Sequence, residues 1–225
     1  MERVAGTATK PPVGHSKTMS QDLPELPSHA FAKADPDDDE LFYGPARLVT
    51  HIDGDATAAL ARFYASRLRK DDAVLDLMSS WISHLPADLD LREVVGHGMN
   101  GEELAANPRL DSWFVQNLNN VSTLPLGSGR FDAVLCCVGV QYLQQPVAVF
   151  REARRVLRRD GLIAVSFSNR CFPTKAVAVW QALDVNGQAV LVRLYLERAG
   201  FGDVEAIVLR DGREGDPLVC VLGRG

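Results

Sequence analysis

The sequence predicts an α/β domain with a mostly parallel sheet and helices on both faces. Short apolar segments alternate with amphipathic stretches from residue 73 onward. These segments are almost continuously apolar, which favours strands that are covered on both faces and therefore a parallel sheet. The last two apolar segments are joined through a turn at Asp211-Gly212, so we expect a final hairpin and one antiparallel strand at the edge.

Composition narrows the class of protein. The chain has 225 residues, of which 46% are hydrophobic and 24% charged, enough for one sizeable core. The net charge of −5 predicts no basic face, so we expect no nucleic-acid partner. No apolar run approaches the roughly 20 residues of a membrane span, and Met1 to Ser20 lack an apolar signal core, so we expect no membrane association and a cytoplasmic protein.

Cysteine usage points to the same compartment. The four cysteines form no CxxC pair, so we expect buried, reduced thiols and neither a metal site nor a redox motif.

The N-terminal part divides into a tail and a lid. Residues 1–34 are rich in Pro, Ser, Thr and Lys, which predicts a disordered segment, and Met19 would also serve as a start. An acidic run at 35–40 is expected to be solvated. We expect residues 35–225 to form a single domain with a helical N-terminal lid at 35–70, in which Asp55 caps a helix that runs through Arg67.

The remaining elements follow in order along the chain. Two more helices are predicted at 145–158, where Gly161 acts as the C-cap, and at 190–199. The strands are predicted at residues 73–77, 93–98, 113–115, 131–138, 162–167, 204–209 and 218–222.

The end of the first strand is the first candidate for a ligand site, because ligands of open parallel sheets bind at the carboxyl ends of the strands. The chain reads Asp76-Leu77-Met78-Ser79-Ser80 there. Small residues let the backbone approach a ligand, and the serine hydroxyls and N–H groups can donate hydrogen bonds. The alternative is a strand-to-helix turn that serine caps.

The next two strand ends carry side-chain amides. The second strand ends at Gly98-Met99-Asn100, where an amide could bind a ribose hydroxyl. The third is followed by Asn117-Leu118-Asn119, whose amides could pair with an adenine edge while Leu118 packs on the ring. Polar turn residues without a ligand are the alternative in both places, and His97 is interpreted as a core histidine.

The later strand ends suggest contacts with a substrate. Tyr142 follows the fourth strand and could face a substrate or simply pack on the next helix. Asn169, Arg170 and Lys175 follow the fifth strand and would suit an anionic or carbonyl-bearing substrate. Solvated loop charges are the alternative.

The segment FDAVLCCVGVQYLQQPVAVFREARRVLRRDGLIAVSFSN, residues 131–169, resembles the fourth strand, helix and fifth strand of class I S-adenosylmethionine-dependent methyltransferases, especially the branch called type 11. The turn Arg155-Val156-Leu157…Gly161 is part of this likeness, which covers roughly residues 73–225 and the helical lead-in. The resemblance implies a three-layer, Rossmann-like methyltransferase fold with a mostly parallel seven-stranded sheet and one antiparallel edge strand.

The resemblance also implies a cofactor and residue roles. The cofactor would be S-adenosylmethionine, with S-adenosylhomocysteine as product, and the acceptor a small molecule. His51 is the candidate general base, because its lead-in would fold over the pocket, with a helix-start hydrogen bond as the alternative; Tyr142 is the second candidate. Tyr43 and Arg47 would lie on the substrate side. The cofactor pocket would be lined by Asp76, Met78, Ser79, Ser80, Gly98, Met99, Asn100, Asn117, Leu118, Asn119 and Cys137.

The chain departs from the family pattern at three places. Met78 and Ser80 stand where the family's first loop, Asp-x-Gly-x-Gly, has glycines, and Asn100 and Asn117 stand near positions that usually hold acids. These departures keep two alternatives open. One is a non-methylating enzyme, such as a cyclase or isomerase, on the same fold, and the other is a binding protein with a vestigial pocket.

Overall fold

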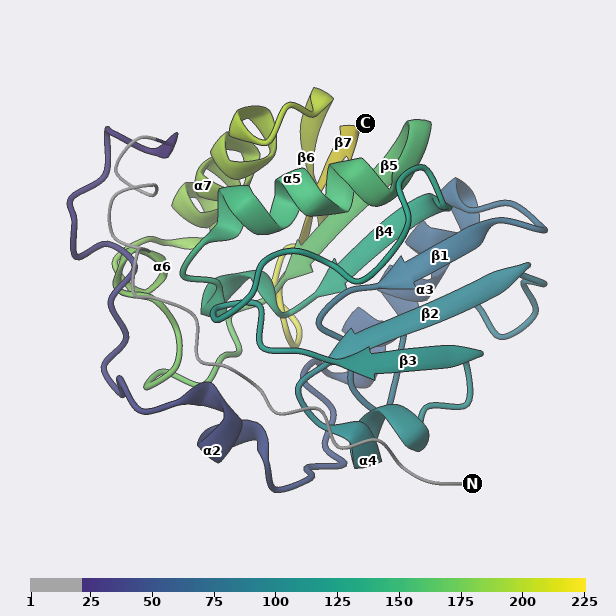
Figure 1. The fold of residues 1–225 in the computed structure, drawn as a ribbon, viewed down its shortest axis with the longest axis horizontal. Helices are drawn as coiled ribbons and strands as arrows, with labels where there is room; N and C mark the ends of the chain where they lie inside the picture. The colour runs from purple at the N-terminus through teal and green to yellow at the C-terminus, as the bar shows by residue number, and fades with distance from the viewer. Residues whose placement is uncertain (1–21) are drawn as a thin grey trace.

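The computed structural model describes residues 22–225, which form one seven-stranded sheet flanked by helices (Figure 1). The strand order is β3-β2-β1-β4-β5-β7-β6. Strand β7 pairs antiparallel with both β5 and the outermost strand β6, and the other pairs are parallel. The predicted fold class is therefore confirmed. The strands are β1 (Ala73–Asp76), β2 (Glu93–Gly98), β3 (Ser112–Val115), β4 (Phe131–Cys137), β5 (Leu157–Phe167), β6 (Gly202–Arg210) and β7 (Leu218–Arg224).

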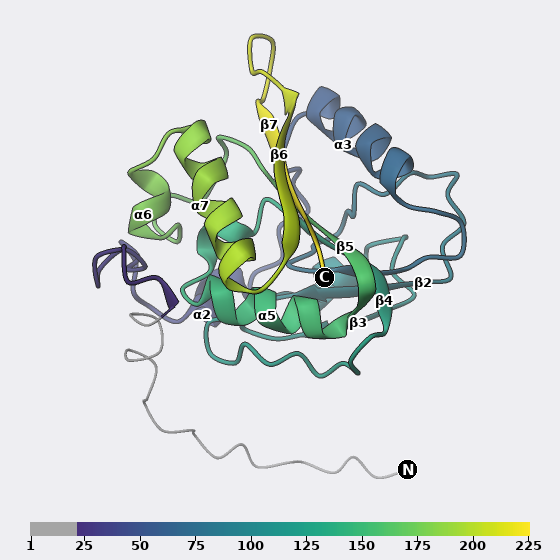
Figure 2. The same ribbon diagram turned by 90° about the horizontal axis from the view of Figure 1, so that it is seen from above.

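The helices form two layers on opposite faces of this sheet (Figure 2). On one face, α5 and α7 pack with the core that contains Phe150 and Tyr195. On the other face, α3 packs with the core that contains Leu60 and Tyr64. No helix within residues 22–225 is both long and apolar enough to span a bilayer. The helices are α2 (Asp39–Tyr43), α3 (Gly54–Arg67), α4 (Gly101–Ala105), α5 (Pro146–Val156), α6 (Ala178–Gln181), α7 (Val185–Arg198) and the 3-10 helix η1 (Val140–Tyr142).

Three predicted helix boundaries are wrong. Helix α7 begins at Val185 and not at residue 190, because the Asp184 carboxylate caps it by accepting the Gly187 N–H at 2.8 Å. Helix α3 is capped by Asp53 and not by Asp55, because the Asp53 carboxylate accepts the Ala56 N–H at 2.8 Å. Helix α5 ends at Val156, and the chain continues directly into β5, so Gly161 is not a helix C-cap. A Cβ at Gly161 would lie 2.8 Å from the carbonyl oxygen of Arg158, which explains the glycine at this irregular part of β5.

Residues 22–34 fall in the segment that the sequence predicts to be disordered, yet they pack on the domain. Leu23, Ala30 and Phe31 are buried in the same core as α5 and α7. Lys33 forms an antiparallel bridge with Val177. A few well-spaced apolar side chains are enough for this docking, and average composition does not reveal them. The part of that prediction that concerns residues 1–21 lies outside the described residues.

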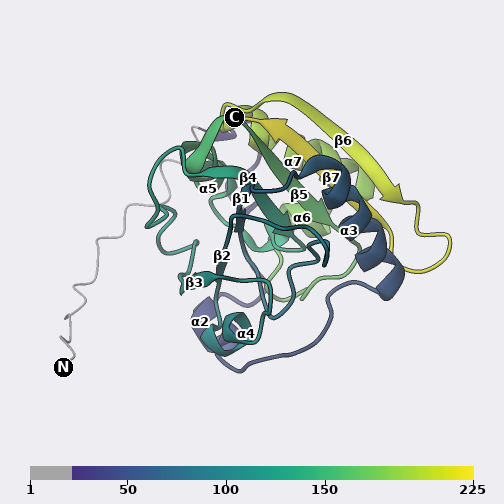
Figure 3. The same ribbon diagram turned by 90° about the vertical axis from the view of Figure 1, so that its right-hand side faces the viewer.

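Residues 35–53, which contain α2 and lead to α3, are called the lid from here on. It passes beside α4, which follows β2 (Figure 3). Its far end is fixed to the β6–β7 loop, since the Asp53 N–H donates to the Asp216 carboxylate at 2.8 Å and the Asp216 N–H donates to the Asp53 carboxylate at 2.6 Å. The connection from β1 to β2, residues 77–92, contains no helix and lies on the lid side, where the Trp81 indole donates to the carbonyl oxygen of Val49 at 2.9 Å.

Candidate functional site

A cavity lies between the lid and the carboxyl ends of the strands. It encloses about 1100 Å³ of empty space, a volume that includes the open mouth. Every residue predicted for the cofactor lines this one cavity, as do Tyr43, Arg47, His51 and Tyr142. Trp81, the bulky side chain of the first loop, is not among the lining residues and does not plug it.

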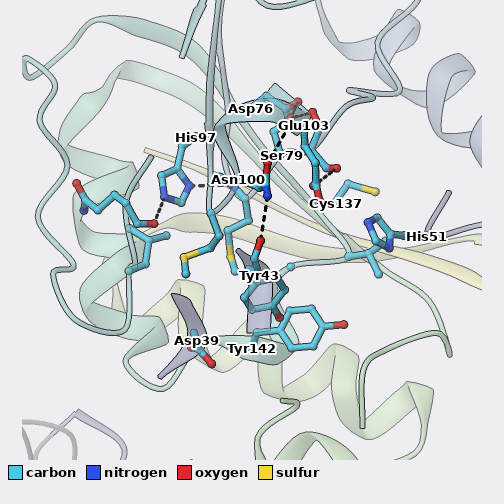
Figure 4. A pocket seen from close by; sticks show the side chains of 18 of the residues that line it. Asp39, Tyr43, His51, Asp76, Ser79, His97, Asn100, Glu103, Cys137 and Tyr142 are labelled. Atoms are coloured by element: carbon cyan, nitrogen blue, oxygen red, sulfur yellow. Dashed lines mark hydrogen bonds between the residues drawn. The ribbon is translucent and has the colours of Figure 1, made fainter. Parts of the chain in front are cut away.

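Figure 4 shows how the labelled side chains divide around the cavity. Asp76, Ser79 and Glu103 lie on one side, Asp39, Tyr43 and Tyr142 lie on the opposite side, and His51 stands apart from both groups. The buried acid Asp76 therefore faces the two tyrosine rings across the cavity.

Asp76 is the acid at the end of β1, and its side chain is buried. Its carboxylate accepts the Ser79 hydroxyl at 2.6 Å. Burial raises the pKa of Asp76 to about 6, while hydrogen bonds from Ser79 and Ser83 act in the opposite direction. A buried carboxylate with few partners is favourable for a bound cation or for hydrogen-bond donors of a ligand.

His97 supports the first loop in place of the missing glycines. Its Nδ1 accepts the Met78 N–H at 3.1 Å, and its backbone carbonyl accepts the Ser79 N–H at 2.6 Å. Its Nε2 lies 3.0 Å from the carbonyl oxygen of Gln116, so the proton is on Nε2 and the ring is neutral. Burial lowers the pKa of His97 to about 4. The core reading of His97 thus fits this structure, where the ring ties β1, β2 and the end of β3 together.

Met78 has a left-handed backbone conformation with φ +59°, which is the reason that glycine suits this position in the family pattern. The side chain of Met78 takes space that would otherwise be open. Gly139 makes room for it, because a Cβ there would lie 2.8 Å from Met78 Cβ and 3.0 Å from its sulfur. The methionine and the distant glycine therefore form a matched pair.

The amides of Asn100 and Asn119 are already occupied by protein partners. Asn100 Oδ1 caps α4 by accepting two N–H groups, and its Nδ2 donates to the carbonyl oxygens of Tyr43 at 3.1 Å and Gly44 at 2.7 Å. Asn119 Nδ2 donates to the Asp39 carboxylate at 2.8 Å and to the carbonyl oxygen of Tyr142 at 3.0 Å, and its Oδ1 accepts from Gln144. In this arrangement both residues hold the lid and have no donor left for a nucleoside.

Two other cavity residues keep capacity for a ligand. Asn117 uses only its Oδ1, which accepts the Asn119 N–H at 3.0 Å, so within residues 22–225 its Nδ2 hydrogens have no partner. The carboxylate of Glu103 accepts the Arg47 N–H at 2.7 Å and the Ser80 hydroxyl at 2.6 Å, one on each oxygen. Each of its oxygens retains a lone pair, so Glu103 can accept further hydrogen bonds in the region where the family pattern places an acid.

A buried ionic cluster fixes the other end of the lid. Lys175 is fully buried, with its ammonium 3.0 Å from the Asp35 carboxylate and 2.8 Å from the carbonyl oxygen of Asp37. Lys33 and Asp39 form an ion pair at 2.5 Å inside the same cluster, and Asp39 is buried. The prediction that the acidic run is solvated is therefore wrong at Asp39.

The three residues predicted after β5 do not line the cavity. The ammonium group of Lys175 is paired within the buried ionic cluster described above. Arg170 pairs with the Asp216 carboxylate at 2.7 Å, and Asn169 is exposed and accepts the Ser168 hydroxyl at 3.2 Å. The polar groups of these residues suggested a ligand, but the partners of Lys175 lie in the lid and the partner of Arg170 lies in the β6–β7 loop.

Two histidines face the cavity near each other. Burial lowers the pKa of His51, and burial together with the neighbouring charge of His51 lowers the pKa of His84 to about 4. Both rings are therefore neutral near pH 7 and could accept a proton, and His84 Nδ1 is buried without a partner among residues 22–225. Tyr142 already accepts the Phe172 N–H at 2.9 Å through its hydroxyl oxygen, and burial raises the pKa of Tyr142 to about 12, so its hydroxyl stays protonated near pH 7 and is not available as a base.

Sequence reasoning missed His84 and Glu103. Neither lies directly after a strand: Glu103 is in the first turn of α4, and His84 lies within the helix-free connection that returns to the cavity. A signal for Glu103 was present, because an acid in the first turn of a helix that follows a strand end is close to that end. No local signal marks His84.

Comparisons with known proteins agree with this geometry. Residues 82–165 match the family described as "Methyltransferase domain", and the match begins just after the loop that lacks glycines. No curated protein is similar to the chain in sequence.

Solved structures share the fold at low sequence identity. A chain of the complex formed by the Haloferax volcanii Trm112 methyltransferase activator is 14% identical, covers 76% of this chain and 90% of that chain, and has a TM-score of 0.56. A SAM-dependent methyltransferase from Aquifex aeolicus is 15% identical, with coverage of 77% and 90% and a TM-score of 0.54. The [4+2]-cyclase SpnF is 13% identical, with coverage of 80% and 88% and a TM-score of 0.56. These matches confirm the resemblance to class I S-adenosylmethionine-dependent methyltransferases.

Proposed function

We propose that this chain is a cytoplasmic enzyme that binds S-adenosylmethionine and transfers its methyl group to a small-molecule acceptor. The observation that carries the proposal is the buried carboxyl group of Asp76, which shares one cavity with the ends of β2, β3 and β4. The match of residues 82–165 to a methyltransferase domain supports it. The four unpaired cysteines suit a reducing compartment.

The donor set of the cavity fits this cofactor. Its acids, Asp76 and Glu103, favour a positively charged ligand and can accept hydrogen bonds from hydroxyl groups. Asn117 offers its two Nδ2 hydrogens, which have no partner among residues 22–225, and Leu118 offers a buried apolar surface. When bound, S-adenosylmethionine supplies an electrophilic methyl group on a positive sulfonium.

The protein's own residues would orient the acceptor and take up its proton. His51 is the proposed base, because it lines the cavity and burial keeps its ring neutral. The lid shields this region from water, which strengthens the hydrogen bonds inside it.

Binding of S-adenosylhomocysteine, measured by titration calorimetry on the full chain, tests the cofactor. Asp76→Ala should abolish the binding, while Asp88→Ala, at an exposed position, should leave it unchanged. Thermal unfolding of both variants shows whether they remain folded. Absence of binding to the unaltered protein at millimolar ligand contradicts the proposal.

A non-methylating enzyme is the second candidate, and two observations favour it. Met78 fills the position of the family's first glycine, and Asn100 and Asn119 are committed to the lid. S-adenosylhomocysteine formed in proportion to product would exclude this candidate, whereas product without it would support it. For a binding protein with a vestigial pocket, neither the cofactor nor its demethylated form would shift the melting temperature, although a ligand at ~100 times its Kd stabilises by ~2.7 kcal/mol.

A further inference from the structure

The lid side of the cavity is an aromatic wall, formed by Tyr43 of α2, Tyr142 of η1 and Phe172 of the loop after β5. The ring centroids of these residues lie 6.1 to 6.4 Å from one another. All three residues line the cavity, although they come from distant parts of the sequence. Aromatic side chains are favoured partners for flat, unsaturated ligands, because rings stack or meet edge to face at such distances.

Hydrogen bonds hold the Tyr142 side chain and the backbones of Phe172 and Tyr43 in place. The Phe172 N–H donates to the Tyr142 hydroxyl oxygen at 2.9 Å, and the carbonyl oxygen of Tyr43 accepts from Asn100. The hydroxyl of Tyr43 is buried and has no hydrogen-bond partner among residues 22–225. A buried polar group of this kind favours a ligand that offers it a partner. The wall is thus preorganised and carries one unsatisfied hydroxyl.

Arg47 adds a positive charge to the same wall. Its guanidinium carbon lies 4.6 Å from the ring centroid of Phe42 and 5.9 Å from that of Phe172. The hydrogen bond between the Arg47 N–H and Glu103 fixes its backbone. Within residues 22–225 the guanidinium pairs with no carboxylate, and its single hydrogen bond, to the carbonyl oxygen of Pro45, is long at 3.4 Å.

The other charges of the lid are compensated, which leaves Arg47 as the charge that a ligand would meet. Asp39 is paired with Lys33, and Lys175 is paired with Asp35. Of the other acids that line the cavity, Asp76 lies on the side opposite Tyr43 and Tyr142 (Figure 4), whereas the Glu103 carboxylate contacts the Arg47 N–H. The Arg47 guanidinium, which pairs with no carboxylate among the described residues, is therefore the positive charge beside the aromatic wall.

We propose that the aromatic wall binds a planar aromatic acid, with its ring against Tyr43, Tyr142 and Phe172 and its carboxylate on Arg47. The inference rests on the proposed function in that this molecule would be the acceptor. A guanidinium binds a carboxylate through two parallel hydrogen bonds and stacks on aromatic rings at the same time. A cationic amine would suit an aromatic wall alone, but the positive charge of Arg47 beside the Phe172 ring would repel it.

Calorimetric titration of the full chain with 4-hydroxybenzoate tests this site, run both with and without saturating S-adenosylhomocysteine. Phenol lacks the carboxylate and cyclohexanecarboxylate lacks the aromatic ring, so they serve as matched probes. We expect 4-hydroxybenzoate to bind at least ~10-fold more tightly than either probe, because it alone engages both the wall and the guanidinium. Equal binding of the three compounds, or no binding of any, would overturn the inference.

Two variants separate the contributions. Arg47→Gln should reduce the affinity for 4-hydroxybenzoate to that for phenol and leave phenol unaffected, while Arg159→Gln, whose side chain is 96% exposed, should change neither. Phe172→Leu should weaken the binding of 4-hydroxybenzoate but not the binding of cyclohexanecarboxylate. If Arg47→Gln leaves 4-hydroxybenzoate binding intact, the inference is wrong.

The titrations also distinguish this inference from the proposed function. Loss of aromatic-acid binding with intact S-adenosylhomocysteine binding refutes the acceptor site alone. Aromatic-acid binding without any S-adenosylhomocysteine binding supports the acceptor site and refutes the cofactor.

Discussion

Replacement of Asn100 tests whether the amide at the end of β2 holds the lid. Two variants divide its roles. Asn100→Asp keeps the oxygen that caps α4 and removes the two hydrogens that bind the lid, whereas Asn100→Ala removes both. A lost N-cap costs about 1 kcal/mol, and each lost hydrogen bond about 1 kcal/mol. We therefore expect the free energy of unfolding to fall by about 3 kcal/mol in Asn100→Ala.

Asn100→Asp should lose about 2 kcal/mol, since the carboxylate keeps the cap but faces the carbonyl oxygens of Tyr43 and Gly44. Urea unfolding gives the stability of both variants. Amide hydrogen exchange then locates the effect, because a lid held less tightly by about 2 kcal/mol exchanges about 30-fold faster at residues 39–53.

The same aspartate distinguishes a lid tether from a ribose ligand. If position 100 binds the ribose, Asn100→Asp restores the family's acid and should tighten S-adenosylhomocysteine binding without loosening the lid. Unchanged exchange at residues 39–53 in Asn100→Asp would refute our reasoning. The helix content, measured by circular dichroism, should be preserved in Asn100→Asp and serves as the control for the cap.

Three further predictions concern the parts that support the cavity. Burial lowers the pKa of His97 to about 4 in the folded state, against about 6.5 when unfolded, so the free energy of unfolding decreases as the pH falls from 6.5 to 4. In His97→Gln, urea unfolding should show a decrease over this range that is smaller by up to about 3 kcal/mol. An unchanged pH profile would contradict this. Lys175→Met should lose about 3 kcal/mol because it leaves the buried Asp39 and the partly buried Asp35 without one of their cations, whereas Arg159→Met, in an exposed ion pair, should leave the stability unchanged; equal losses would show that the lid cluster is not structural. Gly139→Ala should cost about 1–3 kcal/mol through its clash with Met78, and this cost should largely vanish in a Met78→Gly background; a cost that persists there would place the strain elsewhere.

The strands of this fold could be predicted from the sequence because the signal for each is local. A segment such as Val74-Leu75 is apolar on both faces, and the structure buries both faces. Helix α5 likewise has its apolar residues at helical spacing and Pro146 in its first turn. Its end was misplaced because Gly161 resembles a C-cap, although the chain had already entered β5.

The partners of the polar side chains could not be predicted, because they depend on contacts across long stretches of chain. The side-chain amides of Asn100 and Asn119 follow strand ends and therefore suggested ligand binding, and both residues do line the cavity. Their hydrogen bonds go to Tyr43, Gly44 and Asp39, between 56 and 80 residues away. A sequence shows which donors are present at a strand end, and only the fold shows whether they are already used.

The number of contacts that hold the lid indicates that it is a fixed wall of the cavity. Opening it would break the hydrogen bonds made by Asn100, Glu103 and Asn119 and would expose the buried ammonium of Lys175. At about 1 kcal/mol for each hydrogen bond, a ligand that required this opening would lose roughly three orders of magnitude in affinity. Ligands that enter with these bonds intact are therefore favoured, and for such ligands the inner face of the lid, with its aromatic rings and Arg47, becomes a surface that selects the acceptor.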